Sequence, residues 1–582
     1  MTNQKIAEIL EHISVYLEME DESFKPRAYE KAAEAIATLP EELAIIYKKG
    51  GRKAIQEIHG VGASIAEKIE EALTKGRVKY YEDLKRHMPV ELDELLRVEG
   101  LGPKHIKRLY NELGVKDIAS LERAARGNRV AHLAGFGVRS QEKILQAIAF
   151  AKSSGERMVL GFVLPLVREL CERLGDVPGA SEVTIAGSVR RMKETIGDAD
   201  LLAVARSPKK LIDFFVSMPD VMIVHARGDT KASVKLDGGL NVDLRVVPKE
   251  SYGAALNYFT GSKDHNIALR EIAIKKGRKL NEYGLFKGKK RIAGKTEREV
   301  YEALGLSYIE PEIREMGGEI EASRAGDLPT LIGYGDLRGD LQVQTNWTDG
   351  KNSIEEMARA AITSGLEYIA ITDHTKRLAV FGGCDEKKLR RQMKEIDQLN
   401  ERFKIPAYRA GRQDSGFKIL KGTECDILKD GTLDLPDSVL KDLDIVGVSV
   451  HSQFNLPRAE QTKRIIRAME NPYVHVLFHP TGRVIGKREP CDVDMEIVIK
   501  TAQRTGTVLE IDSFPTRLDL RDEYVRQCVK AGVRMTIDSD AHTATQFAYL
   551  ECGIGTARRG WARRSDIINA WPLGKMLQFL KH

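Results

Sequence analysis

The spacing of hydrophobic residues changes twice along the chain. Through residues 1–150, apolar positions recur at i, i+3 and i+4, which predicts amphipathic helices such as Lys5–Glu18, Arg27–Ala37, Ser64–Lys75 and Pro103–Leu113. From about residue 181 the apolar runs become short and β-branched, which predicts strands. From residue 337 onward, seven strand-like runs alternate with amphipathic helical stretches. The pattern predicts a multidomain protein with an all-α part, an α+β part and a C-terminal (β/α)7 barrel of the TIM type.

These changes divide the chain into segments that we expect to fold as domains or subdomains. We expect two helical segments, a sheet-containing segment with a companion subdomain, and the barrel, at residues 1–85, 86–150, 151–248, 249–318 and 337–582. Residues 319–336 are polar, contain glycine and lack periodicity, which predicts a linker between the companion subdomain and the barrel.

Composition narrows the class of protein further. The 582 residues are 42% hydrophobic, which is enough for several packed cores. No run of about 18 apolar residues occurs, so we expect no membrane span. The six cysteines are scattered without a C-x-x-C pair, which is typical of reduced thiols in a cytoplasmic protein. The net charge of +6 is small, and basic and acidic residues are balanced in residues 1–150, so nucleic-acid binding must depend on local motifs.

One such motif occurs three times in the helical part. A helix, a glycine–apolar–glycine turn and a second helix recur at Gly60-Val61-Gly62, Gly100-Leu101-Gly102 and Gly135-Phe136-Gly137. Glycines allow a tight turn and leave backbone N–H groups bare at a helix N-terminus, where they can bind a phosphate. A single copy would be an ordinary helix corner. Three copies resemble the helix-hairpin-helix motif, which binds the DNA backbone without reading sequence.

Acidic residues on two predicted strands indicate a nucleotidyl-transfer centre. Asp198 and Asp200 alternate on one strand and therefore face the same way, and Asp243 lies on a later strand. Three converging carboxylates can bind two magnesium ions for in-line attack on a phosphate. Upstream, Ser188 and Arg191 in the run Gly-Ser-Val-Arg-Arg follow a strand and a glycine, where they can bind a triphosphate.

With the run Tyr-Phe-Thr-Gly-Ser at 258–262, these motifs resemble the family X DNA polymerases, the class of DNA polymerase beta, over about residues 1–318. The resemblance implies that Asp198, Asp200 and Asp243 bind Mg²⁺ and that Ser188 and Arg191 contact the triphosphate. It also implies a template contact at Arg270. The residues that it implies beside the sugar and base of the nucleotide are Tyr258, Phe259, Gly261 and Asn266. Two departures bear on nucleotide stacking and on the triad, because Lys263 stands where the beta enzyme has an acid and Asn241 where it has an arginine.

The same resemblance raises a lyase activity for the N-terminal helices. Lys68 matches the lysine that forms a Schiff base with 5′-deoxyribose phosphate, and Lys25 and Tyr29 match supporting residues. Phe24 and Ser64 replace a histidine and a second lysine of that site. The alternative is that Lys68 binds a phosphate. In the companion subdomain, the basic run Lys275–Arg291 suits either a solvated face or a contact near primer or template.

The predicted barrel strands end in side chains that bind metals. Strand ends of a TIM-like barrel meet at one face, so we expect a site for Mn²⁺ or Zn²⁺ formed by Asp349, His374, Glu424, His451, His479, Asp540 and His542. These runs resemble the polymerase and histidinol phosphatase (PHP) domain that follows the polymerase in many bacterial family X enzymes. That resemblance implies a manganese-dependent 3′→5′ exonuclease, with AP-endonuclease or 3′-phosphatase activity in some members.

The first barrel strand departs from this pattern. Such domains typically have D-L-H-x-H there, but this chain has Asp340-Leu341-Gln342-Val343-Gln344. Gln342 and Gln344 face the same side as Asp340, and a glutamine carbonyl is a poor replacement for imidazole on a transition metal. Asp512 also stands where asparagine is usual. We expect at least one metal position to be weakened and the nuclease to be impaired.

The combined features favour a monomeric, nucleoid-associated DNA polymerase that fills short gaps in base excision repair. Its substrates would be gapped or nicked DNA and deoxynucleoside triphosphates. A template-independent nucleotidyltransferase is the alternative within enzymes, because Gly-Ser followed by D-x-D is shared across that wider superfamily. A DNA-binding repair scaffold with an active exonuclease barrel is the alternative of a different class.

Overall fold

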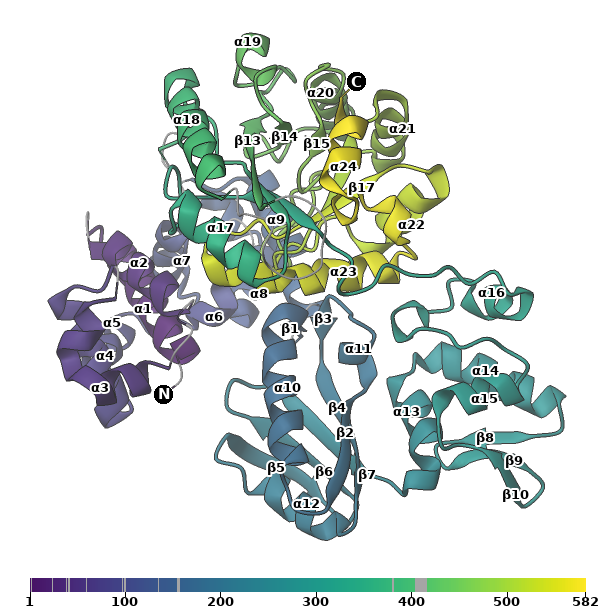
Figure 1. Ribbon diagram of the computed structural model, residues 1–582. Helices are drawn as coiled ribbons and strands as arrows, with labels where there is room; N and C mark the ends of the chain where they lie inside the picture. Colours follow the sequence, from purple (N-terminus) through teal and green to yellow (C-terminus); the bar gives the residue numbers. More distant parts are fainter. Residues whose placement is uncertain are drawn as a thin grey trace. The chain divides into compact units, whose positions relative to one another are not determined.

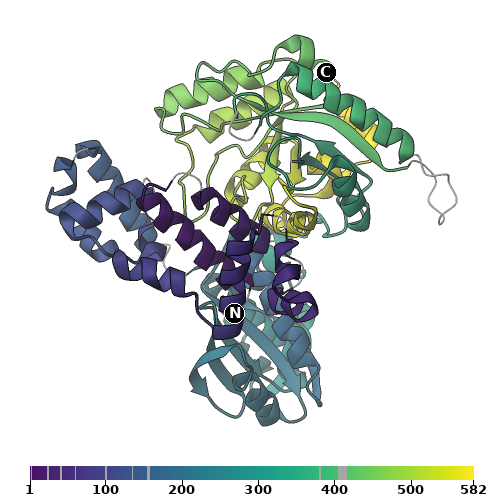
Figure 2. The same cartoon turned by 90° about the vertical axis from the view of Figure 1, so that its left-hand side faces the viewer.

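The computed structural model describes residues 1, 3–22, 25–37, 39, 42–58, 60–96, 98, 101–133, 135–153, 157–378, 382–403 and 416–581. The chain forms two compact units, the first made of residues 1–155 and 486–488 and the second of residues 156–485 and 489–582. Figures 1 and 2 show both units, with the first in purple to blue. No helix among the described residues is long and apolar enough to cross a membrane.

The first unit is helical, as its apolar spacing predicts. Its helices are α1 (Asn3–Met19), α2 (Lys25–Ala37), α3 (Leu43–Gln56), α4 (Ala63–Lys75), α5 (Lys79–His87), α6 (Leu92–Leu95), α7 (Pro103–Leu113), α8 (Ile118–Arg126) and α9 (Val138–Ser153). The i, i+3, i+4 apolar positions, among them Ile13, Ile69 and Ile106, form one continuous buried core. Because α5 runs on to His87, the boundary expected at residue 85 cuts through a helix.

The second unit begins with a mixed sheet that carries the acidic triad. The strands β2 (Ala180–Ile185), β4 (Asp198–Ala205), β5 (Val221–Arg227), β6 (Lys231–Leu236) and β7 (Asn241–Val246) pair in the order β2-β4-β7-β6-β5. A separate pair is formed by β1 (Met158–Val159) and β3 (Thr195–Ile196). The helices α10 (Leu160–Gly175) and α12 (Pro208–Val216) pack on the sheet through a shared apolar core (Figure 1). A one-turn helix, α11 (Gly187–Arg190), follows β2.

A smaller subdomain follows the sheet. It contains α13 (Tyr252–Thr260), α14 (Lys263–Lys275), β8 (Lys279–Asn281), β9 (Gly284–Lys287), β10 (Lys290–Ala293) and α15 (Glu297–Ala303). The prediction of a linker at 319–336 is wrong for much of that segment. It begins with α16 (Glu319–Ala325), and Ile320 and Leu331 are buried in the core of the subdomain. The apolar residues of the segment follow no helical or strand period, although several of them pack well.

The C-terminal part is a barrel of seven parallel strands in sequence order, as predicted. The strands are β11 (Gly339–Val343), β12 (Tyr368–Ile371), β13 (Lys418–Asp426), β14 (Ile445–Ser449), β15 (Val476–Leu477), β16 (Val508–Asp512) and β17 (Met535–Asp538). A parallel bridge between Val343 and Ala541 brings the first and last strands together. The surrounding helices are α17 (Ile354–Thr363), α18 (Glu386–Arg402), α19 (Asp437–Leu440), α20 (Arg458–Met469), α21 (Met495–Thr505), α22 (Asp522–Ala531), α23 (Leu550–Arg559) and α24 (Leu573–Leu580).

Candidate active sites

Strand pairing brings the three acidic residues of the sheet together. β4 and β7 are parallel neighbours, and their register places Asp200 directly opposite Asp243. Asp198 lies two residues before Asp200 and so faces the same side of the sheet. Burial, reinforced by Asp198 and Asp243, raises the pKa of Asp200 to about 7. Three carboxylates that repel one another in this way fit divalent cations, which would stabilise the charged form of all three.

The turn after β2 closes over this triad. Gly187 has a φ of +61°, and a Cβ added there would lie 2.1 Å from Oδ2 of Asp200, so no other residue fits. The backbone of the turn therefore approaches the carboxylates closely, as a site for a charged phosphate chain beside metal ions requires. Ser188, in the same one-turn helix, and Arg191, directly after it, are thus placed beside the triad.

The two arginines of this turn have different partners. Arg190 donates from both terminal nitrogens to Glu297, at 2.9 and 2.6 Å, and so joins the turn to α15. Arg191 donates from Nε to Oε1 of Glu315 at 3.0 Å, and from Nη1 to the carbonyl of Thr260. The sequence did not distinguish these roles. Both terminal nitrogens of Arg190 are used in binding Glu297 of the smaller subdomain. The partner of Arg191, Glu315, is a half-buried carboxylate that a triphosphate could replace.

The expected sugar and base contacts lie together in the smaller subdomain. Asn266 donates from Nδ2 to the carbonyl of Tyr258 at 2.7 Å, and Arg270 donates from Nε to the carbonyl of Asn266 at 3.2 Å. A small pocket is lined by residues of α13, α14 and β8: Ala254, Asn257, Tyr258, Asn266, Arg270, Leu280 and Asn281. Phe259 lies edge-on to Tyr258, with ring centroids 5.1 Å apart, and Gly261 ends the helix after them.

The hairpin glycines of the first unit fall into two conformational groups. Gly60 and Gly135 have φ of +84° and +86°, which favours glycine. Gly62 and Gly102 precede α4 and α7 with nearly identical backbone angles, φ −77° with ψ 169° and φ −78° with ψ 170°. A Cβ at Gly62, Gly102 or Gly137 would meet no atom within 4 Å. Gly100 lies outside the described residues.

Lys68 has a defined surrounding in the first unit. Its Nζ lies 3.0 Å from Oγ of Ser64, and it lies over the rings of Tyr80 and Tyr29 at 4.9 and 5.8 Å from their centroids. Lys25 pairs with Glu22 at 2.9 Å. Tyr80 is an additional neighbour that sequence reasoning missed, since its ring reaches Lys68 only through tertiary packing. Phe24 lies outside the described residues.

The strand ends of the barrel bring together most of the expected metal ligands. Nδ1 of His374 lies 3.1 Å from Glu424 and Nε2 lies 3.4 Å from Asp349. Nε2 of His451 lies 3.1 Å and that of His479 2.7 Å from Oε1 of Glu424. Among the described residues of the barrel, two groups have ligand atoms close enough to bind an ion, namely Asp349 with His374 and His542, and Glu424 with His374 and His451. Asp540 lies beside His542, 3.9 Å from its Nδ1.

The pKa values of the histidines in this centre are set by burial and by the charged residues beside them. Burial opposes charge on His374 and His451, but Glu424 outweighs it and raises the pKa of both histidines. Burial, together with Arg517, lowers the pKa of His479 to about 4. Among the described residues, buried Oδ1 of Asp349 and Nδ1 of His479 have no hydrogen-bond partner. Imidazole nitrogens, carboxylates and these unsatisfied atoms fit divalent transition metals at the two groups.

Gln342 of β11 and Gln344, which directly follows the strand, do face this centre, but they are already hydrogen-bonded there. Gln344 donates from Nε2 to Oε2 of Glu424 at 2.9 Å. The amide of Gln342 faces Glu510, and when it is oriented to donate, its nitrogen lies 3.1 Å from Oε2. The N–H of Gln344 thus donates to a carboxylate of the centre, whereas its buried Oε1 has no hydrogen-bond partner among the described residues. Gln342 and Gln344 make up the glutamine side of this centre.

The structure adds buried charged residues that the sequence analysis did not propose as metal ligands. Glu510 and Asp512 alternate on β16, and Asp538 ends β17. Burial raises the pKa of all three carboxyl groups well above their usual range. Arg517 lies 3.3 Å from Asp512 and 3.6 Å from Asp540. The alternating acids of the run Val-Leu-Glu-Ile-Asp were a visible signal for the first two, whereas no pattern marks Arg517.

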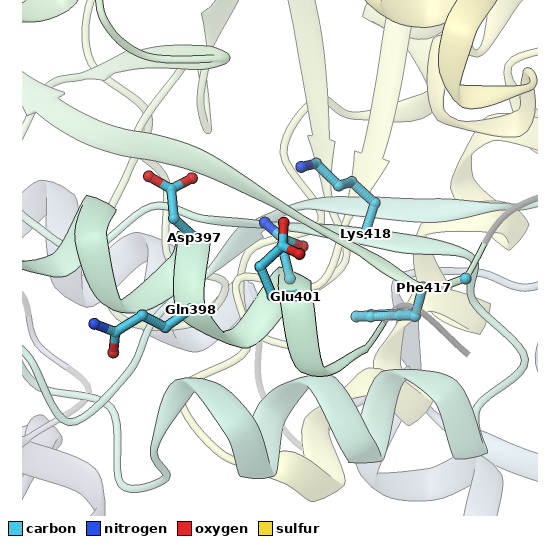
Figure 3. Close-up of a pocket in the computed structure, with 7 residues that line it drawn as sticks. Asp397, Gln398, Glu401, Phe417 and Lys418 are labelled. Atoms are coloured by element: carbon cyan, nitrogen blue, oxygen red, sulfur yellow. The ribbon is translucent and has the colours of Figure 1, made fainter. Parts of the chain in front are cut away.

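A surface pocket of about 660 Å³ lies elsewhere on the barrel (Figure 3). Its lining comes from the end of α18 and the start of β13, namely Asp397, Gln398, Asn400, Glu401, Gly416, Phe417 and Lys418. Residues 404–415, between α18 and β13 in the sequence, lie outside the described residues. None of its lining residues belongs to the carboxylate–histidine centre, so we assign it no role in the chemistry.

Comparison with known proteins agrees with this geometry. Four families match the chain in order: "Helix-hairpin-helix domain" at 1–78, "SAM-like Helix-hairpin-helix tandem" at 92–149, "DNA polymerase beta thumb" at 255–315 and "PHP domain" at 340–487. An acidic triad beside a thumb of this type, with hairpin helices and a PHP barrel, defines a DNA polymerase with an appended barrel. Both kinds of domain generally use divalent metals, and the hairpins and thumb imply DNA binding.

Individual relatives specify the family. The chain is 39% identical to the DNA polymerase/3′-5′ exonuclease PolX of Bacillus subtilis (strain 168) over 586 residues, which covers 100% of both chains. A probable phosphatase of Thermoanaerobacter sp. (strain X514) is 28% identical over 240 residues, 40% of this chain and 88% of the relative. The chain therefore belongs to the family X DNA polymerases that carry a C-terminal PHP domain. The resemblance expected from the sequence motifs is confirmed.

Proposed function

We propose that this chain is a template-directed polymerase that fills short gaps in DNA during base excision repair. Asp198, Asp200 and Asp243 would hold two Mg²⁺ ions, which lower the barrier to in-line attack of the primer 3′-hydroxyl on a deoxynucleoside triphosphate. Ser188 and Arg191 would bind the triphosphate, and Arg191 would exchange Glu315 for phosphate oxygens. The observation that carries the proposal is the register that sets Asp200 opposite Asp243 beneath the Gly187 turn.

The nucleotide and DNA contacts follow from the same arrangement. Tyr258 and Phe259 would pack against the sugar, Gly261 would let the chain pass close to it, and Asn266 and Arg270 would reach the base and the template. The hairpin glycines would hold the DNA backbone on both sides of a gap, because their helix N-termini offer bare N–H groups. The basic run 275–291 would add electrostatic attraction to the duplex. We expect the protein to act as a monomer.

A gapped-duplex extension assay tests this proposal against its alternatives. We expect Mg²⁺-dependent addition of the nucleotide complementary to the template, and none on a single strand. Equal addition with and without template would identify a template-independent nucleotidyltransferase. DNA binding without any extension would identify a repair scaffold. Size-exclusion chromatography with light scattering tests the monomer.

For the barrel we propose a weakened 3′→5′ exonuclease. The relative in Bacillus subtilis is named an exonuclease, and here Asp349, His374, Glu424, His451, His479, Asp540 and His542 would hold Mn²⁺ or Zn²⁺ at the two groups described above. The glutamine side would bind metal poorly, because its amides donate to the carboxylates. Anomalous scattering from crystals grown with Mn²⁺ tests this directly. We expect density at the two histidine groups, whereas a further strong peak beside Gln342 and Gln344 would contradict the proposal.

For Lys68 we propose phosphate binding in preference to Schiff-base chemistry. The ring faces of Tyr29 and Tyr80 attract a charged ammonium, whereas attack on an aldehyde needs the neutral amine. A cationic Lys68 beside Ser64 would suit the 5′-phosphate of a gap. Borohydride treatment with a 5′-deoxyribose phosphate substrate distinguishes the two. A covalent adduct that is lost in Lys68→Ala would establish the lyase, with Lys25 and Tyr29 as its supporting residues.

A further inference from the structure

A helix of the barrel contacts the turn that we assign to the triphosphate. Arg559, the last residue of α23, has a side chain that is only 7% exposed. Its Nη1 donates to the backbone carbonyl of Arg191 at 3.0 Å and to Oε1 of Glu315 at 3.1 Å. Its Nη2 lies 2.6 Å from Asp522 of the barrel. One guanidinium thus joins the barrel to both the main chain and the side-chain partner of Arg191.

Neighbouring contacts hold the same short segment, residues 191–194, against the barrel; it belongs to the palm, the sheet-containing subdomain that carries the acidic triad. A Cβ added to Gly555 of α23 would lie 2.7 Å from Cε of Met192, so the two pack without space between them. Glu194 accepts from Nη2 of Arg483 at 2.7 Å. Arg483 is 5% exposed and follows the metal-ligand candidate His479 by four residues. The segment is therefore fixed at its start, middle and end by barrel residues.

Arg191 and Arg559 share one oxygen of Glu315, and this sharing affects how freely Arg191 can bind a nucleotide. Nε of Arg191 and Nη1 of Arg559 both donate to Oε1 of Glu315, at 3.0 and 3.1 Å. Burial alone would raise the pKa of Glu315, but Arg191, Arg559 and Lys193 outweigh it and lower that pKa. Without Arg559, the carboxylate would be balanced mainly by Arg191. Arg191 would then be held more tightly by Glu315 and be less available to a triphosphate.

We propose that Arg559 is a positioning residue for nucleotide binding, and that the PHP barrel acts through it as a support of the polymerase site. The inference rests on the proposed role of Arg191 in triphosphate binding. Arg559 fixes the carbonyl of Arg191 and shares Glu315 with it, so that Arg191 can turn to the incoming nucleotide. This role is independent of metals in the barrel, and it gives the barrel a function even where its nuclease is weak.

Steady-state kinetics of single-nucleotide gap filling test the proposal on the full-length protein. We expect Arg559→Ala to raise the KM for deoxynucleoside triphosphate about tenfold, as for the loss of one charge-assisted contact, with a smaller change in kcat. Arg559→Lys should restore part of the loss. The matched control is Arg168→Ala, which breaks another palm–barrel ion pair, to Glu551, that does not reach Arg191. Its KM should equal that of the wild type.

Double variants separate positioning from simple destabilisation. In an Arg191→Ala background, Arg559→Ala should add no further increase in KM. In a Glu315→Gln background, its effect should shrink, because no carboxylate remains to restrain Arg191. An effect of equal size in all three backgrounds, or a KM for Arg559→Ala within twofold of wild type, would overturn the inference. If Arg191→Ala itself leaves the KM unchanged, the triphosphate assignment fails instead.

Discussion

Replacing Glu297 by glutamine should loosen the thumb subdomain and the nucleotide-binding turn together. Glu297 begins α15, and its side chain is only 6% exposed. It accepts hydrogen bonds from Arg190 at 2.9 and 2.6 Å, from Arg314 at 2.6 Å and from the hydroxyl of Tyr308 at 3.1 Å. Glutamine keeps the shape and one accepting oxygen, but it removes the charge that balances two buried arginines.

The pKa of Glu297 sets the size of this effect. Burial alone would raise it, but Arg314 and Arg190 outweigh burial and lower the pKa from 4.5 to about 2. A difference of ~2.5 pKa units corresponds to about 3 kcal/mol. Because the folded-state pKa is the lower one, this stability is fully present above about pH 4.5 and is lost as the pH falls toward about 2. The Glu297→Gln variant should therefore lose about 3 kcal/mol at pH 7 and much less at pH 2.5.

Hydrogen exchange followed by mass spectrometry can measure this locally in a multidomain chain. At pH 7, peptides from α11 and from residues 252–315 should exchange about 10²-fold faster in Glu297→Gln than in the wild type, if opening limits exchange there. Peptides from the first unit should be unchanged. The exposed Glu302 lies on the same helix, so Glu302→Gln is the matched control and should not change exchange. Equal protection of wild type and Glu297→Gln at pH 7 would refute the reasoning.

The remaining predictions concern the sites themselves. Asp243→Ala should reduce nucleotide addition by at least ~10²-fold with duplex binding retained, and extension within a few-fold of wild type would contradict the triad. Gly62→Ala with Gly102→Ala should weaken binding to gapped duplex of any sequence without lowering Tm, because the added methyl groups meet no protein atom; a loss confined to some sequences would argue against backbone recognition. Gln342→His with Gln344→His should raise manganese-dependent exonuclease activity above a low wild-type level, and strong wild-type activity that disappears in His542→Ala would show that glutamine suffices.

Much of the catalytic centre followed from local periodicity in the sequence. Alternation on a strand placed Asp198 and Asp200 on one face, and strand order placed the barrel histidines at one end. The first inference needs the sequence of one strand, and the second needs only the order of strands along the chain. The separate tasks of Arg190 and Arg191 could not be predicted, because adjacent residues in a one-turn helix differ only in which distant carboxylate they reach. Glu297 and Glu315 are 107 and 124 residues away from them.

The same limit explains the other omissions. Arg517 reaches Asp512 and Asp540 from a loop without periodicity, and Arg559 ends an ordinary amphipathic helix. The segment 319–336 looked like a linker because its apolar residues follow no period, although Ile320 and Leu331 pack in the core of the thumb and Ile332 packs in that of the barrel. The pairing of Gln342 and Gln344 with carboxylates could not be predicted from the sequence either. Glu510 lies on β16, and only the closed barrel brings it next to Gln342.

The contact between Arg559 and Arg191 also has a consequence for synthesis of the chain on the ribosome. These two residues are 368 positions apart, and at ~5–20 residues per second the later one is added about 20–70 s after the earlier. During that interval a palm domain can fold, but its nucleotide-binding turn still lacks its anchor. A chain that terminates early, after residue 243 but before residue 559, would carry the complete acidic triad and yet bind nucleotide weakly. Prematurely ended products of this gene would thus be poor competitors for repair gaps.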